Sequence, residues 1–213
     1  SITIPSSVTS IGDSPFSDCT SLQSIVVEPN NLNYESKDGV LFTKNLEILI
    51  CFPLKHHFST YTIPSGVISI RYSAFSGCSD LQFITIPTSV SSIGDFAFSD
   101  CSELQSITIP TGVTSIGENA FSNCSKLQSI TIPTSVTSIG NSALCNCFNL
   151  QSITISTSVT SIGDSVFSGC YALKSITIPS SVTSIGDSPF SDCISLQSIV
   201  VESNNLNYES KDG

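Results

Sequence analysis

Residues 104–126 read LQSITIPTGVTSIGENAFSNCSK, and this 23-residue stretch decides the fold because the chain repeats it along most of its length. Six complete units of this length cover residues 58–195, and residues 1–21 are one more unit without its first two positions. Self-similarity with a period of 20–50 residues indicates a solenoid, whose units bury their apolar faces against one another. A cysteine marks one position of each unit: Cys19, Cys78, Cys101, Cys124, Cys147, Cys170 and Cys193.

The unit contains one clear strand signal. In residues 106–109, SITI, the two isoleucines fall on one face and the two hydroxyls on the other, as a half-buried strand requires. Pro110 has no N–H to donate and ends the strand. Gly117 allows a tight or left-handed turn, and residues 118–124 are expected to return as a short helical or irregular segment.

A longer repeat contains several copies of the short one. Residues 1–39 and 175–213 are identical at 37 of 39 positions and differ only at Thr20/Ile194 and Pro29/Ser203. The offset of 174 residues equals five 23-residue units plus the 59-residue stretch 22–80. The chain begins and stops in mid-unit, so we expect residues 1–213 to form a single array that is a fragment of a longer protein.

Residues 22–57 interrupt the period. The segments GVLF and LEILICF flank the turn Thr43-Lys44-Asn45, a pattern that predicts a β-hairpin. This insertion also carries both histidines, three of the seven cationic residues, and Tyr34. Two interpretations stay open: a specificity element that protrudes from a uniform rod, or a structural spacer that adds strands to the sheet without ending the solenoid.

The composition excludes several classes. The 213 residues include 44 Ser and 19 Thr, only 11% are charged, and the net charge is −10. A nucleic-acid surface needs clustered Lys and Arg, which this chain lacks. Hydrophobic content of 39% argues against disorder, and no apolar run approaches the roughly 20 residues of a membrane-spanning helix.

The repeat resembles a known family. Its form, C-x-x-L-x-x-I-x-I-P-x-x-V-x-x-I-G-x-x-A-F, is similar to the BspA-like (treponemal-type) leucine-rich repeats, and the insertion with DGVLF and Pro53 resembles one found in such arrays. The resemblance implies a curved solenoid with a parallel sheet on its concave face. It also implies a non-enzymatic protein, exposed at the cell surface or secreted, that takes part in adhesion.

The exposed side of the predicted strands provides the candidate ligand-binding residues. Small hydroxyls repeat there once per unit, and Phe83 is the one aromatic residue among them. The candidates on the predicted concave face are Thr62, Phe83, Thr85, Ser106, Thr108, Ser129, Thr131, Ser152, Thr154, Ser175 and Thr177.

The cysteines do not fit a metal site or a disulfide framework, because each ladder member lies one whole unit from the next. We expect a ladder of small buried thiols. Cys145 stands outside the ladder and is expected to be an exposed free thiol, with a disulfide as the alternative, whereas Cys51 is expected in the core.

The remaining polar groups suggest little chemistry. His56 and His57 would point to opposite faces of a strand, and no nucleophile motif accompanies them, so we predict no catalytic residue, metal or cofactor. A column of mostly acidic residues follows the Ile-Gly pair and could collect calcium, but turn capping is the expected role. Its members are Asp13, Asp95, Glu118, Asn141, Asp164 and Asp187.

Three functions can be compared. We favour a non-catalytic, monomeric binding rod for a protein or cell-surface ligand, in which repeated weak sites gain avidity. The second is recognition of an ordered surface such as ice or a mineral by the Ser/Thr columns. The third is an enzyme that uses the His56–His57 region.

Overall fold

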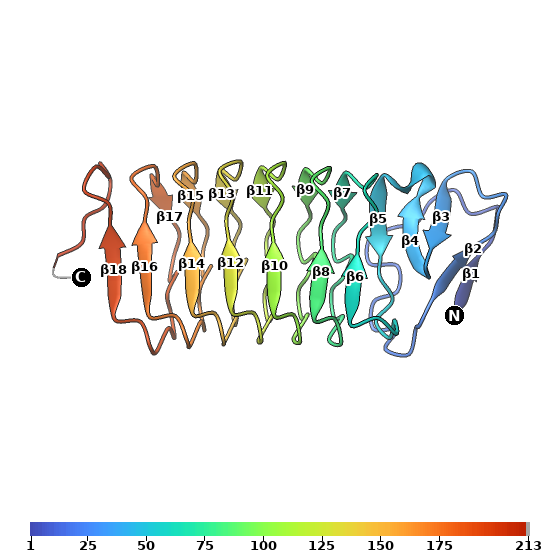
Figure 1. Cartoon of the computed structure of the whole chain (residues 1–213), viewed down its shortest axis with the longest axis horizontal. Helices are drawn as coiled ribbons and strands as arrows, with labels where there is room; N and C mark the ends of the chain where they lie inside the picture. The colour runs from blue at the N-terminus through green and yellow to red at the C-terminus, as the bar shows by residue number, and fades with distance from the viewer. Residues whose placement is uncertain (212–213) are drawn as a thin grey trace.

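The computed structural model describes residues 1–211 as a right-to-left succession of coils along one axis, with the two termini at opposite ends (Figure 1). Each coil contributes a three- or four-residue strand to a first row, in the position that the SITI segments predict. The strands of this row are β1 (Ile2–Ile4), β2 (Ile25–Val27), β6 (Thr60–Thr62), β8 (Phe83–Thr85), β10 (Ser106–Thr108), β12 (Ser129–Thr131), β14 (Ser152–Thr154), β16 (Ser175–Ile178) and β18 (Ser198–Val201).

The first-row strands pair in parallel, and paired residues are 23 positions apart in the sequence. Strands β6 to β14 form a five-stranded sheet, while β1–β2 and β16–β18 form two-stranded sheets. In β10 the isoleucine is buried and the flanking Ser106 and Thr108 are exposed, so the predicted alternation is confirmed. The predicted solenoid with parallel strand pairing is therefore the observed fold.

A second row of strands was not predicted. Two-residue strands form at the Ser-Ile pair of the six units in residues 58–195, and they stack in parallel on the other side of the coil. They are β7 (Ser69–Ile70), β9 (Ser92–Ile93), β11 (Ser115–Ile116), β13 (Ser138–Ile139), β15 (Ser161–Ile162) and β17 (Ser184–Ile185). A two-residue element gives no alternation to read, which is why the pattern looked like a turn.

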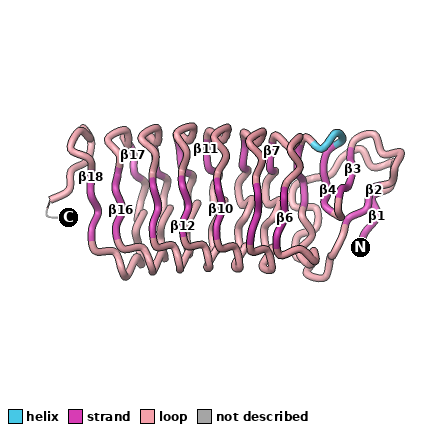
Figure 2. Tube along the Cα trace, viewed as in Figure 1, coloured by secondary structure: helices cyan, strands magenta, loops and turns pink. Residues whose placement is uncertain are grey.

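The segments after these short strands are turns and not helices, so the irregular alternative of the prediction holds. Figure 2 shows short strands joined by long loops, and the described residues 1–211 contain one helical turn. That turn is η1 (Lys44–Leu46), in the insertion. Residues 1–211 contain no helix long and apolar enough to cross a membrane.

Gly117 has a different role from the predicted turn. Its φ is not positive, whereas a Cβ at this position would lie 2.8 Å from the backbone nitrogen of Asp95 in the preceding coil. Gly140 is in the same situation, 2.7 Å from the nitrogen of Glu118. The glycine is required because adjacent coils approach too closely for any side chain.

In the larger core, equivalent apolar side chains of successive coils lie in stacked layers. Phe75, Phe98 and Phe121 lie one above the other, with ring centroids 5.0 and 5.4 Å apart and nearly parallel planes. Phe52, from the end of the insertion, extends the stack at 5.1 Å from Phe75. The insertion therefore returns the chain to the repeat register at Phe52.

The insertion contributes three further strands to the second-row sheet. They are β3 (Tyr34–Lys37), β4 (Val40–Thr43) and β5 (Ile48–Cys51), paired antiparallel as β3–β4 and β4–β5, and β5 pairs in parallel with β7. The predicted hairpin is thus β4–β5, and β3 adds an unpredicted second one.

The β4–β5 hairpin is buried on both faces. Val40, Leu41 and Phe42 are each 0% exposed. Val40 and Phe42 pack into the large core of the later coils, whereas Leu41 and Ile50 pack into a smaller core under β1 and β2. The hairpin is a partition between two cores, so the idea of a protruding element is wrong for this segment.

Candidate functional site

The predicted ligand-binding residues all lie on one exposed face. Every one of the eleven, from Thr62 to Thr177, is exposed at the outer face of β6, β8, β10, β12, β14 or β16. The strand register places equivalent residues side by side, for example Ser106 beside Ser129 and Thr108 beside Thr131. Adjacent strands of a sheet lie about 4.8 Å apart, so the face is a regular grid of hydroxyls.

This grid has free hydrogen-bonding capacity. The side-chain hydrogen bonds within residues 1–211 do not include the hydroxyls of Ser106, Thr108, Ser129 or Thr131. Phe83, 42% exposed, interrupts the grid between Thr60 and Ser106. The face can therefore offer donors, acceptors and one aromatic ring to a ligand.

An apolar stripe borders the grid and was missed in the sequence. Phe148, Tyr171 and Ile194 occupy one repeat position, in the turns before β14, β16 and β18, and are 38%, 42% and 79% exposed. The rings of Phe148 and Tyr171 stack with centroids 4.8 Å apart. The residues at this position in the other coils are Thr20, Ser79, Ser102 and Ser125. Alignment of the units at the position after the ladder cysteine would have revealed the stripe.

The two histidines do not lie on a strand, which corrects the prediction that they point to opposite faces. They lie in the loop between β5 and β6, just after the turn at residues 54–55, and their rings stack with centroids 4.8 Å apart. The Nε2 atom of His56 lies 2.6 Å from the carbonyl oxygen of Asp38, and its Nδ1 accepts a 3.4 Å hydrogen bond from the Phe58 N–H.

This geometry gives His56 a structural role. Burial lowers its pKa below the ordinary value, against an opposing contribution from the hydrogen bond to Asp38. A neutral ring that donates through Nε2 and accepts through Nδ1 has no nitrogen left to act as a general base. It holds the β3–β4 turn, Asp38-Gly39, against the first regular coil.

The thiol ladder lies in the core as predicted at five of its seven positions. Cys101, Cys124 and Cys147 are 0% exposed, and each Sγ donates to the carbonyl oxygen 26 residues earlier, at 3.1–3.2 Å. Burial raises the pKa of these thiols well above its ordinary value.

The other cysteines differ from the ladder in exposure. Cys19 is exposed and Cys193 is partly buried, and each lies at one end of the ladder. Cys145 is partly buried, where an exposed thiol was expected, and Cys51 lies at the edge of the smaller core. Burial raises the pKa of Cys51 to about 12.

The acidic column caps the following coil. Asp95 Oδ1 accepts a 2.8 Å hydrogen bond from the N–H of Glu118, and Asn141 and Asp164 do the same for the next coil at 2.9 and 2.7 Å. These oxygens therefore satisfy backbone donors across the coil interface. Within residues 1–211 no group of three or more His, Cys, Asp or Glu side chains is placed to hold a metal ion.

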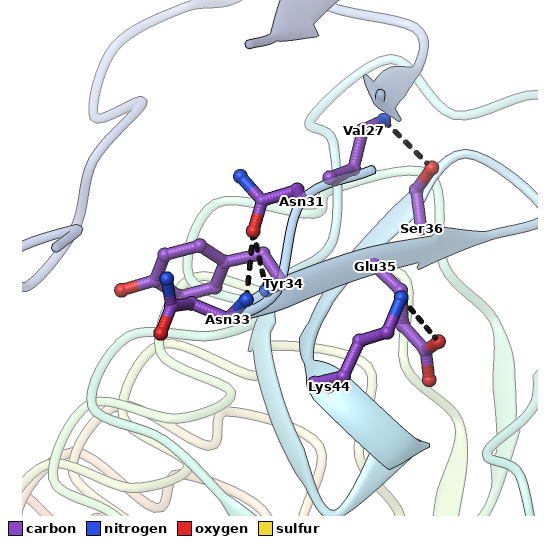
Figure 3. Close-up of polar contacts among 7 residues, drawn as sticks. All are labelled: Val27, Asn31, Asn33, Tyr34, Glu35, Ser36 and Lys44. Atoms are coloured by element: carbon purple, nitrogen blue, oxygen red, sulfur yellow. Dashed lines mark hydrogen bonds and ion pairs between the residues drawn. The ribbon is translucent and has the colours of Figure 1, made fainter. Parts of the chain in front are cut away.

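The insertion turn is held by Asn31, which sequence reasoning did not single out. Its Oδ1 accepts from the N–H groups of Asn33 and Tyr34 at 2.9 Å (Figure 3). Its Nδ2 donates to the carbonyl oxygens of Pro5 and Val8 in the first coil, at 2.9 and 3.0 Å. Tyr34 is buried, and its hydroxyl accepts from the N–H of Ile11, so both residues stabilise the junction.

Comparison with protein families gives one match over nearly the whole chain. The family described as "BspA type Leucine rich repeat region (6 copies)" matches residues 1–51, 49–171 and 93–211. A comparison with curated proteins finds no match.

Solved structures provide close relatives in fold and sequence. A leucine-rich repeat protein from Eubacterium ventriosum is 33% identical, with a TM-score of 0.73 over 89% of this chain and 57% of its own. A leucine-rich cell surface protein from Faecalibacterium prausnitzii is 32% identical, with a TM-score of 0.73 over 99% of this chain and 51% of its own. The pneumococcal vaccine antigen PcpA is 26% identical, with a TM-score of 0.62 over 94% of this chain and 44% of its own. The chain thus spans about half the length of these proteins.

Proposed function

The chain belongs to the BspA-type leucine-rich repeat family, and from that premise we propose that it is a non-catalytic binding rod of a cell-surface or secreted protein. Its ligand is a protein or another component of a cell surface. One similar structure is described as a leucine-rich cell surface protein, and the solenoid provides a long, regular surface of the kind that such proteins use for binding.

The exposed stripe of Phe148, Tyr171 and Ile194 is the observation that carries this proposal. Large apolar side chains at these positions add little to the core, because the equivalent coils fold with Ser or Thr there. Aromatic residues in an exposed patch are typical of protein contacts, where tyrosine is enriched. The hydroxyl grid beside the stripe supplies hydrogen bonds that orient the ligand.

Two observations support the non-catalytic part of this proposal. An active site needs one asymmetric set of groups, whereas this chain presents near-copies of a single unit. The histidine pair, the strongest catalytic candidate in the sequence, has both nitrogens of His56 engaged by the backbone.

The test is binding of the fluorescently labelled chain to cultured epithelial cells and to immobilised extracellular-matrix proteins. Tyr171→Ser restores the residue type of the other coils, and it should reduce binding about tenfold. Tyr72→Ser is the matched control, because Tyr72 is 40% exposed but lies outside the stripe. Equal loss in both variants, or no binding by the unaltered chain, would contradict the proposal.

Ordered-surface recognition stays as the second candidate because the register of β10, β12 and β14 gives a true hydroxyl lattice. Phe83 and the apolar stripe interrupt it on both sides. Thermal hysteresis of a concentrated solution would support this alternative, and ordinary freezing would remove it.

A further inference from the structure

A cleft of about 310 Å³ lies where the insertion interrupts the array. One wall is the loop of the first coil, residues 14–18. The other is the end of the insertion, residues 50–54. In regular coils the equivalent loops are joined directly by hydrogen bonds.

In regular coils, three backbone hydrogen bonds connect each loop to the loop of the following coil, and we call this set the loop ladder. The N–H groups of Ser73, Phe75 and Gly77 donate to the carbonyl oxygens of Asp95, Ala97 and Ser99 in the following coil, at 3.0, 2.8 and 2.8 Å. The insertion keeps one hydrogen bond of this loop ladder, since the Phe52 N–H donates to the carbonyl oxygen of Ala74 at 2.8 Å. Residues 50–54 therefore occupy the layer after the first coil.

The first-coil loop is shaped for the same ladder but does not complete it. Ser14 and Asp18 have φ values of 47° and 57°, close to the 52° of Ser73 and the 76° of Gly77. Among residues 1–211, however, the N–H groups of Ser14, Phe16 and Asp18 find no hydrogen-bond acceptor. These three N–H donors, two residues apart, belong to residues that line the cleft, and the loop already holds them in position. A ligand that binds them therefore causes little loss of conformational entropy.

The cleft is lined by apolar side chains and small hydroxyls, and its charged lining residues are acidic. Phe16, Leu22, Ile50, Phe52 and Leu54 line it together with the prolines of both walls. Its charged lining residues are Asp18 and Asp100, and no Lys, Arg or His lines it. The Cys51 thiol is neutral there, because burial raises its pKa to about 12. An occupant that matches these groups is apolar in part and positively charged.

We propose that this cleft binds an extended, basic segment of a partner protein. The segment's carbonyl oxygens accept from the N–H groups of Ser14, Phe16 and Asp18, in the manner of a strand added to an open edge. One apolar side chain enters between Phe16 and Phe52, and a flanking Lys or Arg pairs with Asp18 or Asp100. The inference rests on the proposed function, because it names a second contact surface of the same binding rod.

The probe is a fluorescein-labelled peptide, acetyl-Lys-Ala-Phe-Ser-Lys-amide, whose central residues copy the loop that completes the ladder in regular coils. We expect saturable binding by fluorescence anisotropy. In ¹⁵N–¹H spectra, the amides of Ser14, Phe16 and Asp18 should shift. Absence of binding at about 1 mM peptide, a concentration that corresponds to a binding free energy of about −4 kcal/mol, would overturn the proposal.

The repeated sequence supplies the control. Residues 188–192 are identical to residues 14–18, but no insertion wall follows them in the described chain. Asp18→Asn removes one charge and still tolerates positive φ, so it should weaken peptide binding about fivefold. Asp192→Asn should leave binding unchanged, and equal effects in the two variants would overturn the assignment.

The peptide assay also separates this inference from the proposed function. If Phe16→Ala abolishes peptide binding while cell binding persists through the stripe, both proposals stand. If the peptide binds but the chain captures no cells or matrix proteins, the cleft stands and the proposed function fails. If Phe16→Ala has no effect on peptide binding, the cleft assignment fails whatever the cell assay shows.

Discussion

The coils at residues 1–21 and 175–195 have almost the same sequence but different surroundings. Ile2 is 40% exposed, whereas its equivalent Ile176 is 2% exposed and packs on the coil before it. Ser184–Ile185 form β17 by pairing with β15, whereas Ser10–Ile11 form no strand. The unit's sequence defines what it can pair with, and the neighbouring coil determines whether the strand forms.

Towards the C-terminal ends of the two copies, at residues 34–37 and 208–211, the first copy is the more buried one. Tyr34 is buried because β4 and β5 cover it, whereas Tyr208 is partly exposed. Residues 34–37 form β3 against β4, but residues 208–211 form no strand. Each copy is thus a matched control for the other, and the contrast can be tested by paired substitutions.

The largest effect is expected for the buried isoleucine. Ile176→Ala should lower the free energy of unfolding by about 2–5 kcal/mol, the range for a truncated core side chain. Ile2→Ala should cost less than about 1 kcal/mol, because that side chain is already partly in water. Urea unfolding of the two variants measures the difference, and equal costs would show that neighbours do not determine burial.

The asparagine pair should show a smaller difference. Asn31 and Asn205 make the same four hydrogen bonds, but Asn31 is 0% exposed. Asn31→Ala leaves buried backbone groups without partners and should cost about 2–3 kcal/mol. Water can replace the amide at the partly exposed Asn205, so Asn205→Ala should cost about 1 kcal/mol. Thermal unfolding of both variants is the measurement.

The glycine pair should give effects of opposite sign. A Cβ at Gly186 would lie 2.5 Å from the backbone nitrogen of Asp164, while one at Gly12 meets nothing within 4 Å. Gly186→Ala should destabilise the chain by about 1–3 kcal/mol through overpacking. Gly12→Ala should be neutral or stabilise by up to about 1 kcal/mol, since it restricts the unfolded chain. Destabilisation by both would contradict the close-approach explanation.

Cys19 and Cys193 should differ in the rate at which a thiol reagent modifies them. This difference involves no change in the free energy of unfolding. Cys19 is exposed, whereas Cys193 is partly buried and its Sγ donates to the Phe167 carbonyl oxygen at 3.1 Å. Burial raises the pKa of Cys193, so less reactive thiolate is present at a given pH. A maleimide should modify Cys19 first, as peptide mapping after brief labelling at pH 7.5 would show. Equal labelling would contradict the burial difference.

The sequence predicted the features that repeat and alternate. The alternation around Ile107 and its equivalents predicted the first-row strands, and the 23-residue spacing of the ladder cysteines predicted how the core layers are stacked. The second row was missed because a pair such as Ser115–Ile116 is too short to show a period. The role of Gly117 was missed because it depends on the approach of a second coil. Phe148 and Tyr171 were missed because they lie in turns, where no alternation of apolar and polar residues marks the exposed positions.

The central claim is that one sequence has different protection from unfolding according to its neighbours, and hydrogen–deuterium exchange tests it directly. Residues 5–19 and 179–193 are identical, so their intrinsic exchange rates are equal, and peptides that extend to Thr20 or Ile194 distinguish the copies by mass. The N–H groups of Thr183 and Gly186 donate to carbonyl oxygens of the preceding coil at 2.8 and 2.9 Å. We therefore predict slower exchange in residues 179–194 than in residues 5–20, by at least tenfold. Equal exchange in the two peptides would contradict the account.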